Sequence, residues 1–262
     1  MELPLDRLIE QEALYLGMLA TTLKTERAWY LVAPGRPDWG DANRALRLRD
    51  TGAGAEATVR EVLATLEKLK MRVVVDVDAP AESQGIGAAL RRRGLMPVAG
   101  RWLLMRYSHN NPPLLPQRGI EVFPVANETG QGEAKAWVKV VMSDEQDAET
   151  AALWREVAER EAAYPPCSLY LACLDGRPVG ACDLFSAEGW GRIDSVVVRP
   201  EFRRRGVASA LVARAVADSL AAGNTLTYLY TDGDGAGEAV YRKLGFTVWE
   251  VNVMQRHLAA AD

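Results

Sequence analysis

A strand-to-helix junction in the segment SVVVRPEFRRRGVASALVARAV, residues 195–216, has the residue types of an anion-binding site. An apolar strand stops at Arg199-Pro200 and a helix begins near Gly206, so the unpaired amides of the first helical turn point toward the end of the strand. Gly206 lets the backbone approach an anion, Ala208 keeps the next turn shallow, and Arg203 to Arg205 add positive potential. The pattern predicts a phosphate site. An ordinary solvated basic start of a helix is the alternative.

A second motif, Tyr241-Arg242-Lys243-Leu244-Gly245-Phe246, follows 35 residues after Gly206, at the end of a short predicted helix. A strand of the type V-x-V-x-P, then R-x-x-G-x-A, then Y-x-x-x-G-F in this order resembles the GNAT superfamily of acyl-CoA-dependent N-acetyltransferases. The resemblance covers about residues 118–257. It implies an α/β fold with a mixed (α+β) sheet and acetyl-CoA as co-substrate.

The resemblance also implies which residues contact acetyl-CoA. The pyrophosphate is assigned to a loop that we call the anion loop, and the pantetheine arm and thioester carbonyl are assigned to main-chain groups of the preceding strand. The anion loop consists of Arg203, Arg204, Arg205, Gly206, Val207, Ala208 and Ser209, and the strand residues are Val196 and Val198.

Tyr241 matches the tyrosine that in many family members donates a proton to the departing thiolate. Its alternative role is that of a helix aromatic packed in the core. Many members carry Asn seven residues before this tyrosine, where this chain has Asp234. An acidic side chain is unfavourable near phosphates, although it can hold the loop through an Asx turn. The contacts of this loop with pantetheine are therefore left open.

Transfer to an amine requires a neutral nitrogen, so a base or a water chain must remove a proton. Asp194 and Glu188 are the candidates. Strand alternation places Asp194 on the same face as Val196 and Val198, although a charged residue at a strand start is an equal explanation. Glu188 lies in a turn, where a solvated acid is the simpler explanation. Three aromatics are candidates for an acceptor groove or for core positions: Trp154, Tyr164 and Trp190.

The elements that must position these residues follow one another as an alternation of strands and helices. Two apolar runs around Asp175-Gly176-Arg177-Pro178 predict a β-hairpin. The expected strands cover residues 120–125, 192–198, 226–230 and 248–254, and the expected helices cover 133–142, 145–162, the segment from Gly206 to Gly223, and 238–244.

The N-terminal half contains a similar but incomplete pattern. When Gly94 is aligned with Gly245, ALRRRGLMPV matches AVYRKLGFTV, and Leu90 then occupies the place of Tyr241. Gln84-Gly85-Ile86-Gly87 lies too close to Gly94 to open a long helix of its own. We therefore expect two tandem GNAT-like copies: a degenerate domain over residues 1–110, a linker over 111–118, and a catalytic domain over 119–262. The first should contain helices at 5–23 and 57–70, a hairpin near 29–48 and a strand at 101–107.

Composition narrows the class of protein. The chain has 48% hydrophobic and 25% charged residues and a net charge of −4, which is globular and gives no overall attraction to nucleic acid or to an anionic membrane. The N-terminus lacks a signal-peptide pattern and no segment is apolar enough to cross a membrane, so a cytoplasmic protein is expected. Cys167, Cys173 and Cys182 and the two histidines form no metal-ligand pattern, and no metal is expected.

The resemblance to the GNAT superfamily implies direct transfer of an acetyl group from acetyl-CoA to a primary amine of a small molecule or peptide. The identity of the acceptor, the acyl length and the oligomeric state have no sequence signal. Two other functions are retained: a non-catalytic acyl-CoA-binding module, disfavoured by Tyr241, and an interaction protein with the same fold, disfavoured by the anion loop.

Overall fold

The structure is a computed structural model. It describes residues 3–36, 39–108, 119–125, 136–137, 139–141, 148–233 and 235–259, without the side chains of residues 149–151 and 153. His109, the expected linker 111–118, Asp234 and half of the helix expected over 133–142 lie outside the described residues. Within them, no helix has the length and apolar character needed to cross a bilayer.

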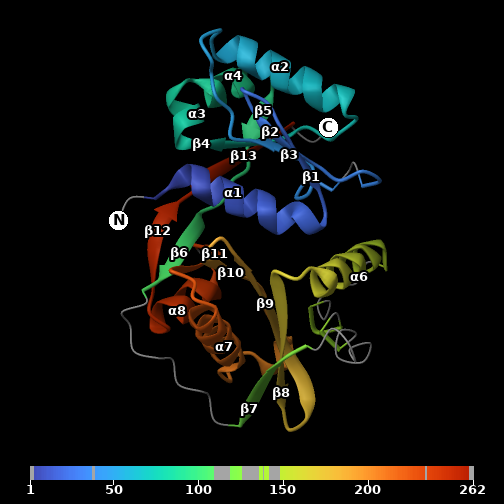
Figure 1. The fold of residues 1–262 in the computed structure, drawn as a ribbon, viewed down its shortest axis with the longest axis vertical. Helices are drawn as coiled ribbons and strands as arrows, with labels where there is room; N and C mark the ends of the chain where they lie inside the picture. The colour runs from blue at the N-terminus through green and yellow to red at the C-terminus, as the bar shows by residue number, and fades with distance from the viewer. Residues whose placement is uncertain are drawn as a thin grey trace. The chain divides into compact units, whose positions relative to one another are not determined.

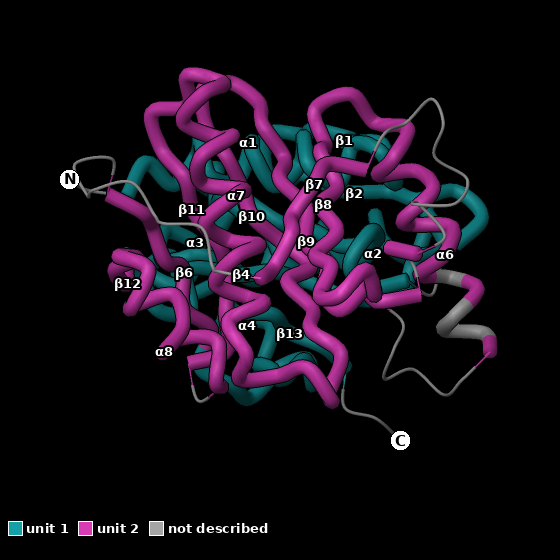
Figure 2. The backbone as a smooth tube through the Cα atoms, turned by 90° about the horizontal axis from the view of Figure 1, so that it is seen from below, with its two compact units in different colours: residues 1–101, 250–262 teal, residues 102–249 magenta. Residues whose placement is uncertain are grey.

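The chain divides into two compact units (Figure 2). Unit 1 consists of residues 1–101 together with 250–262, and unit 2 consists of residues 102–249. The boundaries differ from the cut expected at 111–118. The strand over residues 102–107, before that cut, belongs to the sheet of unit 2, and the strand over residues 254–259, after it, belongs to the sheet of unit 1.

Unit 1 contains a six-stranded mixed sheet in the order β1-β2-β3-β4-β13-β5 (Figure 1). Its strands are β1 (Thr21–Lys24), β2 (Trp29–Val32), β3 (Arg44–Leu46), β4 (Val74–Asp78), β5 (Leu95–Pro97) and β13 (Met254–Ala259). Its helices are α1 (Leu5–Tyr15), a 3₁₀ turn η1 (Leu16–Met18), α2 (Ala55–Lys68), α3 (Ala79–Ser83) and α4 (Ile86–Arg92).

Unit 2 contains a seven-stranded mixed sheet in the order β12-β6-β11-β10-β9-β8-β7. Its strands are β6 (Trp102–Tyr107), β7 (Ile120–Pro124), β8 (Cys167–Leu174), β9 (Arg177–Ala187), β10 (Trp190–Val198), β11 (Leu226–Asp232) and β12 (Phe246–Val251). Its named helices are α6 (Ala148–Ala163), the 3₁₀ turn η2 (Pro200–Phe202), α7 (Val207–Ala221) and α8 (Ala236–Lys243).

The two sheets repeat one pattern, and each receives one strand from the other half of the sequence. In unit 1, β3 and β4 are parallel neighbours joined through α2, and β13 lies between β4 and β5. In unit 2, β10 and β11 are parallel neighbours joined through α7, and β6 lies between β11 and β12. The strand after the first repeat, β6, is thus in the second sheet, and the strand after the second repeat, β13, is in the first. The expected tandem arrangement is present with a reciprocal strand exchange.

Two elements differ from those expected by more than a few residues at an end. The first helix ends at Tyr15 rather than residue 23, since the chain passes into the 3₁₀ turn around Gly17 and then into β1. The single final strand expected at 248–254 is two strands, β12 and β13. Asn252, with φ +49°, turns the chain between them, a conformation that Asn tolerates better than most residues.

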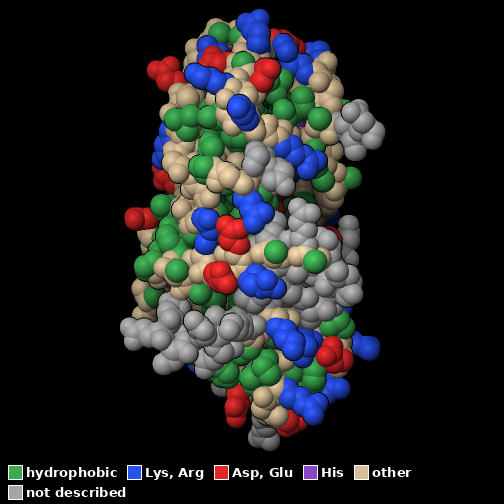
Figure 3. Space-filling view, turned by 90° about the vertical axis from the view of Figure 1, so that its right-hand side faces the viewer, with side chains coloured by type: hydrophobic (Ala, Val, Ile, Leu, Met, Phe, Trp, Pro, Cys, Tyr) green, Lys and Arg blue, Asp and Glu red, His purple; other side chains and the backbone are tan. Residues whose placement is uncertain are grey.

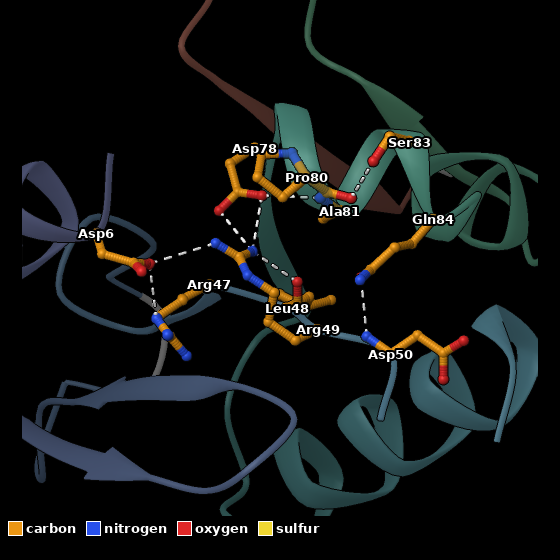
Figure 4. Close-up of polar contacts among 10 residues, drawn as sticks. All are labelled: Asp6, Arg47, Leu48, Arg49, Asp50, Asp78, Pro80, Ala81, Ser83 and Gln84. Carbon is orange, nitrogen blue, oxygen red and sulfur yellow. Dashed lines mark hydrogen bonds and ion pairs between the residues drawn. The ribbon is translucent and has the colours of Figure 1, made fainter. Parts of the chain in front are cut away.

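Buried charged groups tie the sheet of unit 1 together (Figure 4). Asp78 caps α3 by accepting a hydrogen bond from the Ala81 amide at 2.9 Å, and Arg49 Nη1 donates to both Asp78 oxygens at 2.8 Å. On β13, Arg256 Nε donates to buried Asp76 at 3.1 Å. Paired and hydrogen-bonded charges can be buried, whereas unpaired ones are costly.

The sheet of unit 2 has an apolar layer on each face. On one face α7 and α8 pack through Val207, Leu211 and Tyr241 against β9, β10 and β11. On the other, a smaller cluster joins α6 through Ala158 to Leu169 and Leu171 of β8. The predicted hairpin is confirmed: Asp175 (φ +50°) and Gly176 (φ +71°) make the two-residue turn between β8 and β9, as a type I′ turn requires. All three cysteines are buried free thiols.

Candidate active site

The site is built where β10 separates from β11. The two strands pair in parallel from Trp190↔Leu226 to Ile193↔Leu229, and no further. Beyond this point β11 still pairs with β6, up to Asp232↔Trp102, and β10 still pairs with β9, up to Val198↔Gly180. The end of β10 therefore has no strand partner on its β11 side. We call this place the strand opening.

A β-bulge at Ser195 lies at the start of the strand opening. The register of β10 with β9 shifts between Asp194 and Val197, and Ser195 has φ +52°. Such a bulge inserts one residue and bends its strand. This bend accounts for the departure of β10 from the straight path that β11 keeps.

The bulge corrects the placement expected for Asp194. Simple alternation predicted that Asp194 shares a face with Val196 and Val198, but these valines pack with Ile193 on the α7 side of the sheet. Asp194 instead lies on the other face with Arg192, whose Nε donates to Asp194 Oδ2 at 3.1 Å. Asp194 Oδ1 accepts a hydrogen bond from the Ser195 amide at 2.8 Å. The extra residue reverses the alternation from Val196 onward.

The anion loop carries the start of α7 to the end of β10. Gly206 is the N-cap of α7 with φ +86°, a left-handed conformation that suits glycine, and no side chain caps the helix. The amides of Val207, Ala208 and Ser209 precede the first intrahelical bond, which runs from the Ala210 amide to the Gly206 carbonyl. Uncapped first-turn amides and the helix dipole favour an anion here.

Gly180 on β9 fixes how closely this helix start approaches the sheet. A Cβ atom at Gly180 would lie 2.5 Å from Val207 Cγ1 and 3.0 Å from Leu211 Cδ1, which is closer than atoms pack. Any larger residue at Gly180 would push the first turn of α7 away from the strand opening.

The three arginines of the anion loop differ in their contacts. Arg203 Nε donates to the Val198 carbonyl at 3.1 Å, so one of the main-chain groups expected for pantetheine already has a protein partner. Arg204 has a left-handed φ of +62°. Arg205 stacks its guanidinium over Phe202 at 5.3 Å and lines a groove of about 510 Å³ with Arg177 and four other residues, Leu174, Asp175, Glu201 and Phe202. Elsewhere basic and acidic side chains are interspersed, as on the face shown in Figure 3.

Tyr241 lies in the core beside the strand opening. It projects from α8, is 8% exposed, and its ring meets Phe246 edge-on at 6.1 Å between centroids. Burial, followed by the charges of Asp194 and Cys182, raises the pKa of Tyr241 above its ordinary value. The phenol is therefore protonated throughout the neutral range, as a proton donor must be. Tyr241 also belongs to the main apolar cluster, so its packing agrees with the alternative role of an aromatic residue of the core.

Glu188 is not brought to the strand opening. It is an exposed residue with φ +50° in the turn between β9 and β10. Four strand residues separate this turn from Asp194 along β10, Trp190 to Ile193, which at about 3.3 Å per residue is a distance of more than 10 Å. Among the two expected bases, only Asp194 lies near the place where β10 and β11 part.

The sequence analysis missed another acid, Asp183, which lies directly across from Asp194 on β9. It is fully buried, and its only signal in the sequence is a charge inside the apolar run VGACDLF. The three aromatics expected in a groove are scattered: Trp154 is 38% exposed on α6, Tyr164 stacks on Phe185, and Trp190 is buried against Tyr228.

Unit 1 has a counterpart of the anion loop at a place that the sequence analysis did not select. The segment from Asp50 to Gly54 joins β3 to α2, as the anion loop joins β10 to α7. Here the Asp50 carboxylate accepts hydrogen bonds from the amides of Gly52 (3.0 Å) and Gly54 (2.9 Å), and the Asp50 amide donates to Gln84 (Figure 4). The protein's own carboxylate thus occupies the position of an anion. Leu90, which aligns with Tyr241, is a buried residue of α4.

Known proteins were compared with the chain at the levels of sequence and structure. Residues 134–246 match the model of the Acetyltransferase (GNAT) family, and no curated protein matches the chain. Among solved structures, a GCN5-related N-acetyltransferase from Kribbella flavida matches 100% of this chain and 97% of its own at a TM-score of 0.70 and 19% identity.

Two further solved structures have the same fold. A GCN5-related N-acetyltransferase from Sphaerobacter thermophilus gives a TM-score of 0.60 at 19% identity over 90% of this chain and 81% of its own. A tandem GNAT protein from the clavulanic acid biosynthesis pathway gives 0.63 at 14% identity over 88% and 77%. The fold is therefore that of GNAT proteins, some of which are tandem, and the part of the chain that matches the GNAT acetyltransferase family is residues 134–246.

Proposed function

We propose that unit 2 binds acetyl-CoA and transfers its acetyl group directly to a primary amine of a small molecule or peptide. The observation that carries this proposal is the meeting of the strand opening with the uncapped start of α7. A diphosphate suits the amides of residues 204–208 and the Ser209 side chain, and an extended arm suits the unpaired edge of β10 at Val196 and Val198. For the Val198 carbonyl to bind that arm, Arg203 has to release it.

In this proposal the residues of the chain have three tasks. The anion loop holds the nucleotide end, and the edge of β10 aligns the thioester with the amine. Because the nitrogen attacks the carbonyl carbon directly, the C–N bond forms as the C–S bond breaks, and the departing thiolate needs a proton. Tyr241 supplies it, since its phenol lies in the core beside the strand opening and carries its proton at neutral pH.

Replacement of Tyr241 by Phe is expected to lower kcat about 10²- to 10³-fold, the usual effect of a positioned proton donor, while the Kd for acetyl-CoA stays unchanged. Thiol release from acetyl-CoA with an amine found by screening, together with calorimetry, measures both. Tyr107→Phe is the matched control, because Tyr107 is another buried phenol whose ring contacts Phe246, at 5.4 Å. If Tyr241→Phe kept full turnover, Tyr241 would be a core residue only.

We also propose that unit 1 does not bind acetyl-CoA and serves as a scaffold. Asp50 already uses two amides of the loop before α2, those of Gly52 and Gly54, and Leu90 stands where Tyr241 would be. The protein is proposed to work in the cytoplasm, because its three free thiols suit a reducing compartment.

A further inference from the structure

Asp183 and Asp194 face each other across β9 and β10 at the start of the strand opening. They are register partners in the antiparallel ladder, so their side chains lie on the same face of the sheet. Directly opposed Cβ atoms are about 5 Å apart, and two like charges at that distance are destabilising. The sequence maintains this juxtaposition where a substrate would enter.

The two carboxyl groups differ in their contacts. Asp194 has an ion pair with Arg192 and a hydrogen bond from the Ser195 amide, and its side chain is 37% exposed. Asp183 is 0% exposed, and neither of its oxygens has a hydrogen-bond partner among the described residues. A buried carboxyl without a donor is costly for stability. The pair is open to solvent through Asp194, and at Asp183 the Ser195 side chain is close enough to act on the carboxyl without completing a hydrogen bond.

Burial raises the pKa of Asp183 to about 7, and the charge of Asp194 is the second cause of this rise. The Ser195 side chain and the Arg192 guanidinium lower the pKa and offset the rise in part. The other ionisable groups nearby are Cys167 on β8 and the buried Cys182. Burial raises the pKa of Cys167, and the charges of Asp183 and of Glu161 on α6 raise it further. Among the described residues, Arg192 is the one cation that lowers the pKa of Asp183.

We propose that the Asp183–Asp194 pair binds the primary ammonium group of the acceptor and that Asp183 takes its proton. This inference rests on the proposed function, and it extends that function to β9, a strand to which the sequence pattern assigns no chemistry. An alkylammonium supplies N–H donors to the Asp183 oxygens, which accept no hydrogen bond from the described residues, and adds a second positive charge beside Arg192 to a pair of two acids.

The protons balance as follows. The ammonium gives one proton to the Asp183 carboxylate, and the lone pair that this leaves on nitrogen attacks the thioester carbonyl carbon. As the C–N bond forms and the C–S bond breaks, the thiolate takes a proton from Tyr241, and the second proton of the nitrogen restores the phenol. Asp183 then releases its proton to water.

The test is calorimetric titration of 1,4-diaminobutane into the protein saturated with coenzyme A, where no acetyl transfer occurs. A bound ammonium that lowers the raised pKa of Asp183 should release protons at neutral pH, measured in buffers of different ionisation enthalpy. At pH 5.5 affinity should fall about tenfold or more, since little carboxylate remains. 1,4-Butanediol, the neutral analogue, should not bind.

Asp183→Asn should weaken binding of the diamine by about tenfold or more and abolish the proton release. Glu121→Gln, at an exposed position on the edge strand β7, should change neither the affinity nor the proton release. Folding of the variant is checked by thermal melting. Wild-type stability should fall as the pH rises from about 4 to 7, because the folded state binds the Asp183 proton more tightly, and Asp183→Asn should lack this fall.

No diamine binding to the wild-type complex with coenzyme A, or equal binding and proton release in Asp183→Asn, would overturn the inference and leave the proposed function standing. Absence of coenzyme A binding would instead remove the proposed function.

Discussion

A Gly206→Glu protein is expected to lose acetyl-CoA binding while it remains folded. Gly206 has φ +86° at the uncapped start of α7, so a side chain there strains the backbone and places a carboxylate among the amides meant for a diphosphate. Two unit charges about 4 Å apart repel by about 4 kcal/mol at a partly screened protein surface. This corresponds to about a thousandfold increase in Kd. Calorimetry with acetyl-CoA measures the change.

The matched control is Gly223→Glu. Gly223 also has a left-handed φ, +77°, a Cβ atom there would have no neighbour within 4 Å, and the residue follows the opposite end of the same helix. The two variants share the added charge and the strain, and they differ in their distance from the anion loop. Only Gly206→Glu should lose binding. Equal loss in both variants, or unchanged affinity in Gly206→Glu, would place the nucleotide elsewhere.

Truncation of the chain after Asn252 is expected to unfold unit 1, although the deleted strand is the last in the sequence. β13 pairs with β4 from Met254↔Asp78 to Leu258↔Val74 and with β5 from His257↔Pro97 to Ala259↔Leu95. It also supplies Arg256 to buried Asp76. The deletion removes the strand between β4 and β5 and one of the two arginines on Asp76, of which Arg44 remains, and a domain has only about 5–15 kcal/mol of stability.

Hydrogen exchange at β4 measures this loss. The amides of residues 74–78 should exchange freely in the truncated protein and stay protected in a control chain that ends at Ala259 and keeps β13. Unit 2 retains all its strands in both, so acetyl-CoA binding should persist. Protected β4 amides without β13 would mean that the strand exchange is not needed for folding.

Local features of the sequence predicted the parts of the site that are made by local structure. The left-handed Gly206 at the start of α7, the Asp175-Gly176 turn and the place of Tyr241 on a short helix depend on neighbouring residues, so spacing and residue type suffice to find them. The tandem pattern was also visible, because ALRRRGLMPV and AVYRKLGFTV occupy equivalent elements, from α4 to β5 and from α8 to β12.

Features that depend on pairing between distant strands could not be predicted. β6 and β13 have similar contexts in the sequence, and only the sheets show that each belongs to the other unit. The bulge at Ser195 reverses the side chains that follow it, which placed Asp194 on the wrong face. Asp183 becomes a candidate only once its register with Asp194 is known, and Asp50 only once its bonds to the Gly52 and Gly54 amides are known.

Titration of acetyl-CoA into the purified protein by calorimetry tests the central claim most directly, because it gives affinity and stoichiometry together. The account predicts one site per chain, lost in Gly206→Glu, since the anion loop of unit 2 is uncapped and Asp50 fills its counterpart in unit 1. Two sites per chain would contradict the role given to Asp50. No binding at saturating ligand would contradict the acetyltransferase itself.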